Sequence, residues 1–369
     1  MKIAFFLSQY GQGGVERMLI NTARGLAERG HQVDYLSPAD GAFLGALPAS
    51  IQHHPLAGGK RRSRTALGAY MDAERPAFVI VGKDDDAATA IAAKRRSGAD
   101  VRVVVRPGTT ISRRLAGRSA FKRWRTYRAL RRIYRQADGV VANSLGVRDD
   151  IAAITGIPAT SIHLVRNPVI TPDFHRAAEG DLPHPWFGAD EPPVLLGAGG
   201  LRRQKDFSTL VSAFAQVRQQ RPARLVILGT GHLESALRAQ GRSLGVEDDL
   251  ALPGFIENPY PWMANASVFV LSSLWEGSPN VLTEALALGT PVVSTDCPSG
   301  PHETLQGGRY GPLTPPGDAD AMADAILRTL NAPLPAAVLQ EAVAEYTMER
   351  NAAGYEAMLA SIHGGPMPA

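Results

Sequence analysis

The sequence has a single cysteine, Cys297, among its 369 residues. One cysteine cannot form an internal disulfide, which excludes a small secreted scaffold held together by several of them. No apolar run reaches the roughly 20 residues that a transmembrane helix needs. The first residues, MKIAFFLSQYG, lack the cleavage site of a secretion signal, so we expect them to form a buried strand. These absences favour a cytoplasmic globular protein.

Acidic residues are missing from one long stretch. Residues 101–137 carry twelve Lys and Arg and no Asp or Glu, which gives this stretch a charge of +12. Because the net charge of the chain is +4, the remaining residues together carry −8. Within this stretch, the basic segment 113–135 falls on a predicted helix at about 117–136. That helix has an apolar stripe, formed by Phe121, Trp124, Tyr127, Leu130, Ile133, Tyr134 and Ala137.

The basic segment allows two interpretations. Either the stripe packs on a sheet and the arginines are solvated, or the helix docks on an anionic membrane or holds a lipid-diphosphate acceptor. The second interpretation implies a peripheral location on the inner face of the cytoplasmic membrane. Nucleic acid is disfavoured as a partner, because the sequence contains no known nucleic-acid-binding module.

Apolar strands alternate with helices along the chain, which predicts an α/β protein with parallel, doubly wound sheets. A proline-rich stretch interrupts this alternation of strands and helices, which then resumes. We therefore expect two Rossmann-like domains that face each other across a cleft. Residues 1–168 would form the first domain, 169–193 a linker, and 194–345 the second. Residues 346–369 would form a helix that packs back on the first domain, followed by a tail.

The stretch WEGSPNVLTEALALG, residues 275–289, places two acids around a predicted helix start. It follows the apolar strand SVFVLSS, and Gly277 or Ser278 could cap a helix at about 279–288 whose first turn holds Pro279. Amides near Asn280 and Val281 would attract an anion such as a diphosphate. Glu276 would face a cleft, Glu284 would reach ligand hydroxyls, and Gly289 would end the helix.

This stretch resembles the E-x7-E signature of retaining glycosyltransferases of family 4, which have the GT-B fold. Other blocks along the chain resemble the same family: GGVER at 13–17, GGLRRQKDF at 199–207, LGTGHL, LPGFIENP and TPVVSTDCPSGPHE. The resemblance therefore extends over nearly the whole chain. It implies a transferase that uses a nucleotide-sugar donor, most simply a UDP-sugar, and needs neither a metal ion nor another cofactor.

The resemblance also implies roles for individual residues. Glu276 would contact the donor sugar, Glu284 the ribose, and Lys205 with Arg203 the leaving diphosphate. The remaining residues implied in donor binding are Gly13, Gly14, Gly229, Gly231, Gly277, Ser278, Pro279, Asn280 and Val281. Arg202 and Arg106 are further candidates, and Arg106 could equally be a buried cation paired with a carboxylate.

The chain departs from the family pattern in two places. Gly200 stands where an arginine usually precedes the leucine of the phosphate loop, and RPGTT replaces a block that often contains a histidine. His302 stands where relatives often have arginine, and a functional role for it is no better supported than an exposed helix-start histidine. The triplet Asp84–Asp86 could bind a divalent metal with a nucleotide, but its position before a predicted helix at about 87–97 favours a capping role.

The block TDCPSGP is similar to that of enzymes that build polyprenyl-diphosphate-linked or lipopolysaccharide glycans, which predicts a glycan or lipid-linked acceptor. Two alternatives stay open: a nucleotide-sugar epimerase of the same architecture, and a catalytically silent nucleotide-sugar-binding subunit. A dehydrogenase is disfavoured, because Glu16 occupies the place of the third glycine in the dinucleotide-binding fingerprint.

Overall fold

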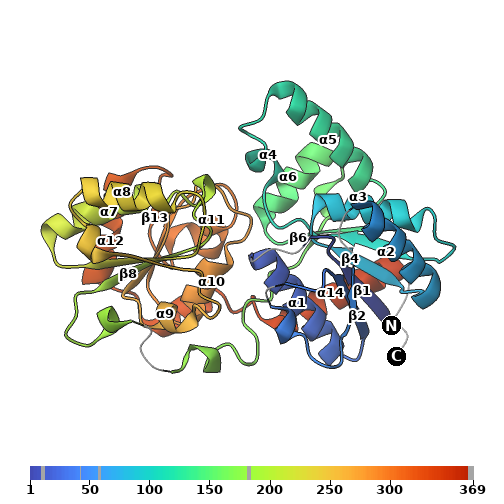
Figure 1. Cartoon of the computed structure of the whole chain (residues 1–369), viewed down its shortest axis with the longest axis horizontal. Helices are drawn as coiled ribbons and strands as arrows, with labels where there is room; N and C mark the ends of the chain where they lie inside the picture. The colour runs from blue at the N-terminus through green and yellow to red at the C-terminus, as the bar shows by residue number, and fades with distance from the viewer. Residues whose placement is uncertain (10–12, 42, 57–59, 181–183, 365–369) are drawn as a thin grey trace. The chain divides into compact units, whose positions relative to one another are not determined.

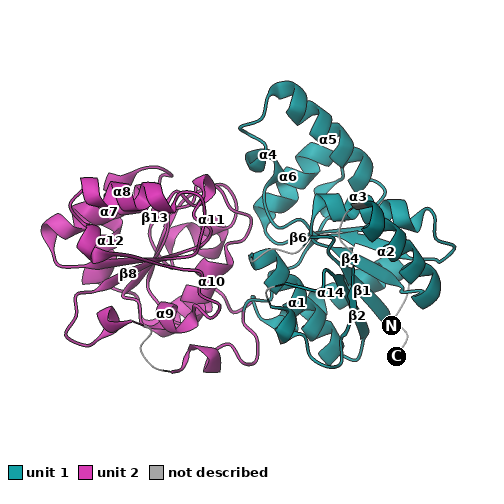
Figure 2. Cartoon of the chain, viewed as in Figure 1, with its two compact units in different colours: residues 1–169, 346–369 teal, residues 170–345 magenta. Residues whose placement is uncertain are grey.

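The computed structural model describes residues 1–9, 13–41, 43–56, 60–180 and 184–364. Residues 10–12 of QYGQGG, the glycine loop that ends in the first two residues of the GGVER block, lie outside that description, as does most of the expected tail, residues 365–369. The chain forms two compact units: unit 1 comprises residues 1–169 and 346–369, and unit 2 comprises residues 170–345 (Figure 2). Residues 170–193, expected to be a linker, group with unit 2.

Unit 1 is built on a seven-stranded parallel sheet with the order β3-β2-β1-β4-β5-β6-β7. Its central strands are apolar and buried along their whole length, as expected for a sheet covered on both faces. The strands are β1 (Lys2–Phe6), β2 (Gln32–Ser37), β3 (Gln52–Pro55), β4 (Phe78–Val81), β5 (Arg102–Val105), β6 (Gly139–Ala142) and β7 (His163–Leu164).

Helices cover both faces of this sheet (Figure 1). One face packs against α1 and the C-terminal helix α14, whose Tyr355 and Leu359 are buried among β1 side chains. The other face packs against the helices that connect the remaining strands. The helices of unit 1 are α1 (Gly14–Glu28), α2 (Lys60–Glu74), α3 (Asp84–Lys94), α4 (Ile111–Arg114), α5 (Ala120–Tyr134), α6 (Leu145–Thr155) and α14 (Met348–His363).

Two elements of unit 1 were not predicted from the sequence. Strand β3 and helix α2 lie in the stretch between β2 and β4, for which the sequence predicted neither a strand nor a helix. The sequence of α2, KRRSRTALGAYMDAE, is mostly polar, and only a narrow stripe that includes Leu67 and Met71 is buried. β3 is a short edge strand with exposed or half-buried residues, so neither element has a strong hydrophobic period.

Unit 2 repeats the plan with a six-stranded parallel sheet of order β10-β9-β8-β11-β12-β13. Its strands are β8 (Val194–Ala198), β9 (Arg224–Leu228), β10 (Leu250–Gly254), β11 (Val268–Leu271), β12 (Val292–Thr295) and β13 (Leu313–Thr314). Its helices are α7 (Phe207–Gln220), α8 (Glu234–Ser243), α9 (Tyr260–Ala264), α10 (Asn280–Ala287), α11 (Pro301–Thr304), α12 (Ala319–Asn331) and α13 (Ala336–Glu341). Throughout the described chain, no helix is both long and apolar enough to cross a bilayer.

The strand order of each unit reverses direction at one point, between β1 and β4 in unit 1 and between β8 and β11 in unit 2. In open parallel sheets, ligands bind at such switch points, beyond the carboxyl ends of the strands. In unit 2 the loops that leave these strands are 199–206 and 272–279, which contain Arg203, Lys205 and Glu276. The topology therefore predicts that a ligand of unit 2 binds at these two loops.

Candidate functional site

The two loops at the switch point of unit 2 are joined by an ion pair. Lys205 lies in the turn between β8 and α7, and its Nζ donates to Oε1 of Glu276, in the loop after β11, at 2.6 Å. The side chains are only 13% and 9% exposed, so the pair is poorly screened by water. A fixed cation and a fixed anion thus lie side by side at the carboxyl edge of the sheet.

Hydrogen bonds hold both loops in this arrangement. Ser273 Oγ donates to the same Glu276 oxygen at 2.7 Å, and Ser272 Oγ donates to the Lys205 carbonyl at 2.7 Å. Gln204 is bonded twice, because its side-chain amide donates to the Trp275 carbonyl and its own carbonyl accepts from the Leu274 amide. The two serines and Gln204 were not predicted from the sequence. For the serines, their position directly after the buried strand β11 was the available signal.

Helix α10 follows the Glu276 loop and begins at Asn280, with Pro279 at its N-cap position. The expectation that Gly277 or Ser278 caps a helix from about 279 was therefore wrong: in the structure the helix has no side-chain cap. The Leu282 and Thr283 amides donate to the Pro279 carbonyl at 3.1 and 3.2 Å. The Val281 amide precedes these bonds and has no acceptor within the helix, as is usual in a first turn.

The rest of α10 orients Glu284 and ends as expected. Glu284 lies one turn into the helix and is almost completely buried. The Gly289 amide donates to the Leu286 carbonyl and the Thr290 amide to the Ala285 carbonyl, and Gly289 has a φ of 76°. These are the two bonds of a Schellman ending, which confirms the predicted role of Gly289.

Gly229 and Gly231 lie where the loop after β9 crosses the loop after β8. A Cβ on Gly229 would be 2.1 Å from the Gly199 carbonyl oxygen, and one on Gly231 would be 2.3 Å from that of Leu201. The Leu201 amide donates to the Thr230 carbonyl at 2.9 Å. The two glycines therefore let one backbone pack directly on the other, and this contact shapes the loop that contains Lys205.

We expect Gly229→Ala and Gly231→Ala each to lower the free energy of unfolding by more than ~2 kcal/mol, because backbone atoms would have to move. Gly245→Ala is the matched control: Gly245 has a φ of 68° but open space around its Cβ position. Gly245→Ala should lower the free energy of unfolding by about 1 kcal/mol, because alanine is strained in the left-handed conformation. Urea unfolding measures all three, and an equal cost for the three variants would contradict the packing argument.

The three basic residues of the loop after β8 differ in their surroundings. Arg202 and Arg203 are exposed, whereas Lys205 is mostly buried. A Cβ placed on Gly200 would lie 2.9 Å from Nε of Arg202 and 3.3 Å from its Cζ. The Arg202 guanidinium thus occupies the space that a side chain at position 200 would take, so a cation is held there although residue 200 is a glycine.

Cys297 is buried near the ion pair, in the loop after β12. Burial, together with the negative charge of Glu276, raises the pKa of its thiol to about 12. Because only the thiolate is alkylated, we expect no reaction of the folded protein with iodoacetamide at about pH 8 and complete reaction after unfolding. Mass spectrometry counts the adduct directly, since Cys297 is the only cysteine. Stoichiometric labelling of folded protein would contradict this expectation.

In unit 1, the expected glycine loop leads into α1, with Gly13 at its N-cap position and Gly14 as its first residue. A Cβ on Gly13 would be 3.2 Å from Oε2 of Glu16, which is buried. Lys83, which follows β4, donates to the other Glu16 oxygen at 2.7 Å. An ion pair therefore also lies at the switch point of unit 1, although neither of its members was singled out as a site residue.

Arg106 is buried directly after β5, and its guanidinium bonds the side-chain amide oxygen of Asn167. The alternative of a buried cation is thus correct as to burial, but the bonded partner is an amide rather than the carboxylate we expected. Burial lowers the pKa of Arg106. Gly108 and Tyr355 lie beside it, so Arg106 is part of the packed interior of unit 1.

The acidic triplet begins helix α3 at Asp84 itself, three residues before the expected start. Asp84 accepts from Arg114 and from Tyr134, while Asp86 accepts from the backbone and side chain of Ser8. These bonds give the acids structural roles at the helix start. Among the described residues, no three His, Cys, Asp or Glu side chains are grouped as metal ligands would be. His302 is exposed and bonds Asp296 at 3.0 Å.

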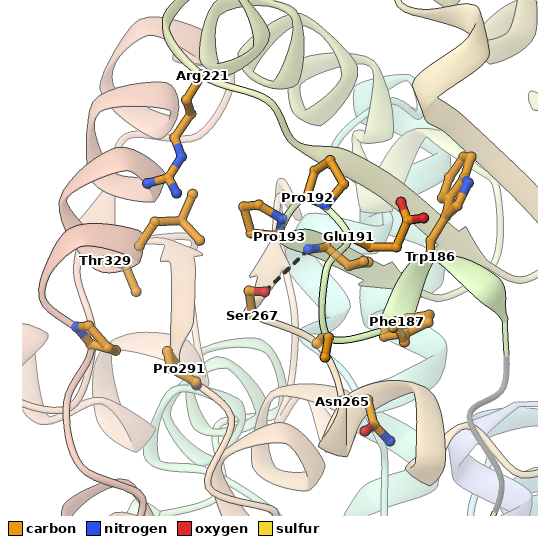
Figure 3. A pocket seen from close by; sticks show the side chains of 16 residues that line it. Trp186, Phe187, Glu191, Pro192, Pro193, Arg221, Asn265, Ser267, Pro291 and Thr329 are labelled. Carbon is orange, nitrogen blue, oxygen red and sulfur yellow. Dashed lines mark hydrogen bonds between the residues drawn. The ribbon is translucent and has the colours of Figure 1, made fainter.

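A cavity of about 520 Å³ lies elsewhere in unit 2 (Figure 3). Its wall includes Trp186, Val194, Ser267 and Pro291, and the Val194 amide donates to Ser267 Oγ at 3.2 Å. Val194 starts β8, and Ser267 and Pro291 directly precede β11 and β12. The cavity therefore lies at the amino edge of the sheet, opposite the edge where ligands of parallel sheets bind, and includes none of the candidate residues.

Comparison with protein families gives two matches, which together extend over most of the chain. Residues 12–171 match the model described as Glycosyltransferase Family 4, and residues 192–332 match the model described as Glycosyl transferases group 1. The second match includes both loops of the unit 2 switch point. The first begins within the glycine loop and includes helices α1 to α6.

Curated relatives are similar to part of the chain. An N-acetylgalactosaminyltransferase of Campylobacter jejuni, whose name specifies a diphospho-undecaprenol substrate, is 30% identical over 52% of this chain and 50% of its own length. Lipopolysaccharide 1,6-galactosyltransferase of Escherichia coli is 30% identical over 49% of each chain. An uncharacterised glycosyltransferase of Methanocaldococcus jannaschii is 38% identical over 33% of this chain and 34% of its own. This chain thus matches half or less of the length of these relatives.

Solved structures share the fold at low sequence identity. Anabaena HepE, determined in complex with UDP, has a TM-score of 0.78 at 19% identity, covering 98% of this chain and 100% of its own. A lipopolysaccharide outer core galactosyltransferase has a TM-score of 0.72 at 22% identity, covering 98% and 99%. At these identities, the likeness shows the fold alone.

Proposed function

Because this chain belongs to the glycosyltransferases, with a family 4 domain followed by a group 1 domain and the GT-B fold, we propose that it transfers a sugar with retention of anomeric configuration. The proposed donor is a nucleoside-diphosphate sugar, most simply a UDP-sugar. The proposed acceptor is a glycan or a polyprenyl-diphosphate-linked glycan. The observation that carries the proposal is the Lys205–Glu276 pair at the switch point of unit 2, beside the first turn of α10.

The proposed chemistry follows the movement of charge. The bond between the anomeric carbon and the diphosphate oxygen breaks, so negative charge grows on the diphosphate and positive charge on the sugar. Lys205, Arg203 and the first amides of α10 would stabilise the diphosphate, each well-placed donor contributing on the order of 3 kcal/mol. The acceptor hydroxyl forms the new bond on the same face, and its proton passes to the leaving phosphate. This scheme requires no metal ion.

The two glutamates have separate proposed roles. Glu276, held by Ser273, would accept hydrogen bonds from donor sugar hydroxyls, and Glu284 would bind the ribose. Donor binding then requires Lys205 to exchange part of its bond with Glu276 for a phosphate oxygen. Arg202, held beside Gly200, is proposed as a further diphosphate contact. In unit 2, the proposed donor surface also includes Gly229, Gly231, Gly277, Ser278 and Pro279. In unit 1, Gly13 and Gly14 are proposed as phosphate contacts.

One departure favours a second candidate function, a silent subunit that binds a nucleotide sugar without turnover. The chain has Pro107 and Gly108 where related enzymes often place a histidine, so a histidine acceptor base is missing from that block. A nucleotide-sugar epimerase would require an acid/base set near the sugar. The three functions differ in their products. A transferase releases free nucleoside diphosphate only when acceptor is present, a silent subunit forms no product, and an epimerase forms an isomeric nucleotide sugar.

A thermal-shift screen followed by a turnover assay tests the proposal. UDP and UDP-sugars should raise the melting temperature more than AMP or NAD, because a ligand that binds only the folded state stabilises it. Release of UDP from the sugar selected in the screen, dependent on added acceptor, would support a transferase. NMR of the product would then show whether the anomeric configuration is retained. Absence of any shift with nucleoside diphosphates would contradict donor binding.

A further inference from the structure

The basic segment 113–135 forms a distinct surface in unit 1. It includes the last two residues of α4 and all of α5, and in Figure 1 the loop between these helices and the start of α5 form the part of unit 1 that projects farthest from its sheet. The twelve cations of residues 101–137 are accompanied by no acid in the sequence. None of the candidate donor residues, which belong to unit 2 or to the start of α1, is part of this segment.

The apolar stripe of α5 divides into two halves. In the C-terminal half, Leu130 and Tyr134 are buried in the core of unit 1, where α5 packs on α6 and α3. In the N-terminal half, the Phe121 side chain is 67% exposed and that of Trp124 is 56% exposed. The packing interpretation of the stripe is therefore correct only for its C-terminal half. Two large aromatic side chains remain on the surface without a core to explain them.

These two aromatics form one patch. Their ring centroids are 6.0 Å apart with an interplanar angle of 27°, and the Arg128 guanidinium lies 5.8 Å from the Trp124 centroid. Exposed cations surround them, and none of these cations makes an ion pair within the described part of the chain. We call this set the α5 patch: Arg118, Phe121, Lys122, Arg123, Trp124, Arg125 and Arg128.

Two other cations of the basic segment, Arg114 and Arg131, bond to the rest of unit 1, which distinguishes them from the α5 patch. Arg114 pairs with Asp84, and Arg131 donates to the Ile154 carbonyl at 2.6 Å. Both anchor α4 or α5 to the rest of unit 1. The five cations of the α5 patch, which make no ion pair within the described residues, lie just before α5 and along its first turns, around the exposed aromatic rings.

We propose that the α5 patch docks this chain on an anionic phospholipid bilayer. Phe121 and Trp124 insert at the level of the headgroups, where aromatic side chains are favoured, and the surrounding cations contact lipid phosphates. Charge complementarity requires an anionic occupant, because the α5 patch exposes five cations around its two aromatic rings. A projecting helix that exposes two rings suits a flat bilayer, whereas single-stranded nucleic acid is usually held in a groove. The proposal goes beyond the transferase proposal and is independent of it.

Vesicle sedimentation of the full chain tests the proposal without any substrate. We expect binding to vesicles of phosphatidylcholine mixed with phosphatidylglycerol, little binding to phosphatidylcholine alone, and release by added salt. The double variant Phe121→Ser/Trp124→Ser and the double variant Lys122→Glu/Arg125→Glu should each lower the partition coefficient by at least ~10-fold. These residues are exposed, so circular dichroism should show an unchanged fold.

Matched changes in unit 2 serve as controls. Leu244→Ser removes a side chain that is 43% exposed, and Arg242→Glu/Arg328→Glu reverses two exposed charges. Both controls should bind anionic vesicles as the unmodified chain does. The proposal is overturned if the unmodified chain does not bind these vesicles, if controls and patch variants lose binding equally, or if the patch binds an RNA oligonucleotide in preference to the vesicles.

Discussion

Lys205→Ala is expected to lower kcat by at least ~100-fold with a saturating donor. Glu276 holds the ammonium of Lys205, and the hydrogen bond from Ser272 to the Lys205 carbonyl holds its backbone. The ammonium therefore does not need to be ordered when the diphosphate leaves. A fixed cation of this kind stabilises charge that develops in the transition state more than charge already present in the ground state. Steady-state kinetics with the donor found by thermal shift measures the loss.

A stability effect must be separated from this catalytic effect. Removing the ammonium leaves Glu276 with little exposure and without its cationic partner, which should also lower the melting temperature. Activity is therefore measured well below the melting temperature of the variant. Arg242→Ala removes an exposed cation of unit 2 and should retain full activity. Undiminished turnover by Lys205→Ala would remove this residue from the site.

Glu276→Ala is expected to cause a loss of similar size, at least ~100-fold in kcat. The carboxylate would lose its contacts with the donor sugar, and Lys205 would lose the anion that positions it. Glu276→Gln keeps the shape and an acceptor for Ser273 but removes the charge, so it should recover melting temperature more than activity. Glu247→Gln, in an exposed turn before β10, is the matched control and should be unaffected.

The double variant Lys205→Ala/Glu276→Ala tests whether the two residues act as a unit. If they do, the double variant should lose little more activity than either single variant, because losses within one unit are not additive. Fully multiplicative losses would indicate that the pair seen in the structure has no functional coupling. The measurement requires only kcat/KM values for four proteins.

Much of the fold was predictable from the sequence, because buried parallel strands are apolar over their whole length. Runs such as FVIV of β4 and VFVL of β11 stand out from the helices around them. The ending of α10 was also predictable, because Gly289 at the end of an apolar run is a local signal. By contrast, β3 and α2 were missed, since half-exposed elements at a sheet edge lack a strong period.

The candidate site was predicted residue by residue from resemblance, but its internal contacts were not. No local pattern indicates that Lys205 bonds Glu276, because 71 residues separate them and only the sheet order brings their loops together. The burial of Arg106 against Asn167 depends on tertiary structure in the same way. The division of the α5 stripe likewise depends on where α3 and α6 pack against α5, which the sequence of α5 alone cannot specify.

A crystal structure of this chain with UDP tests the central claim most directly. We predict that the diphosphate contacts the loop 199–205 and the first turn of α10, with Lys205 Nζ within hydrogen-bond distance of a phosphate oxygen. A diphosphate bound away from residues 199–205 and 276–284 would contradict the proposed donor site.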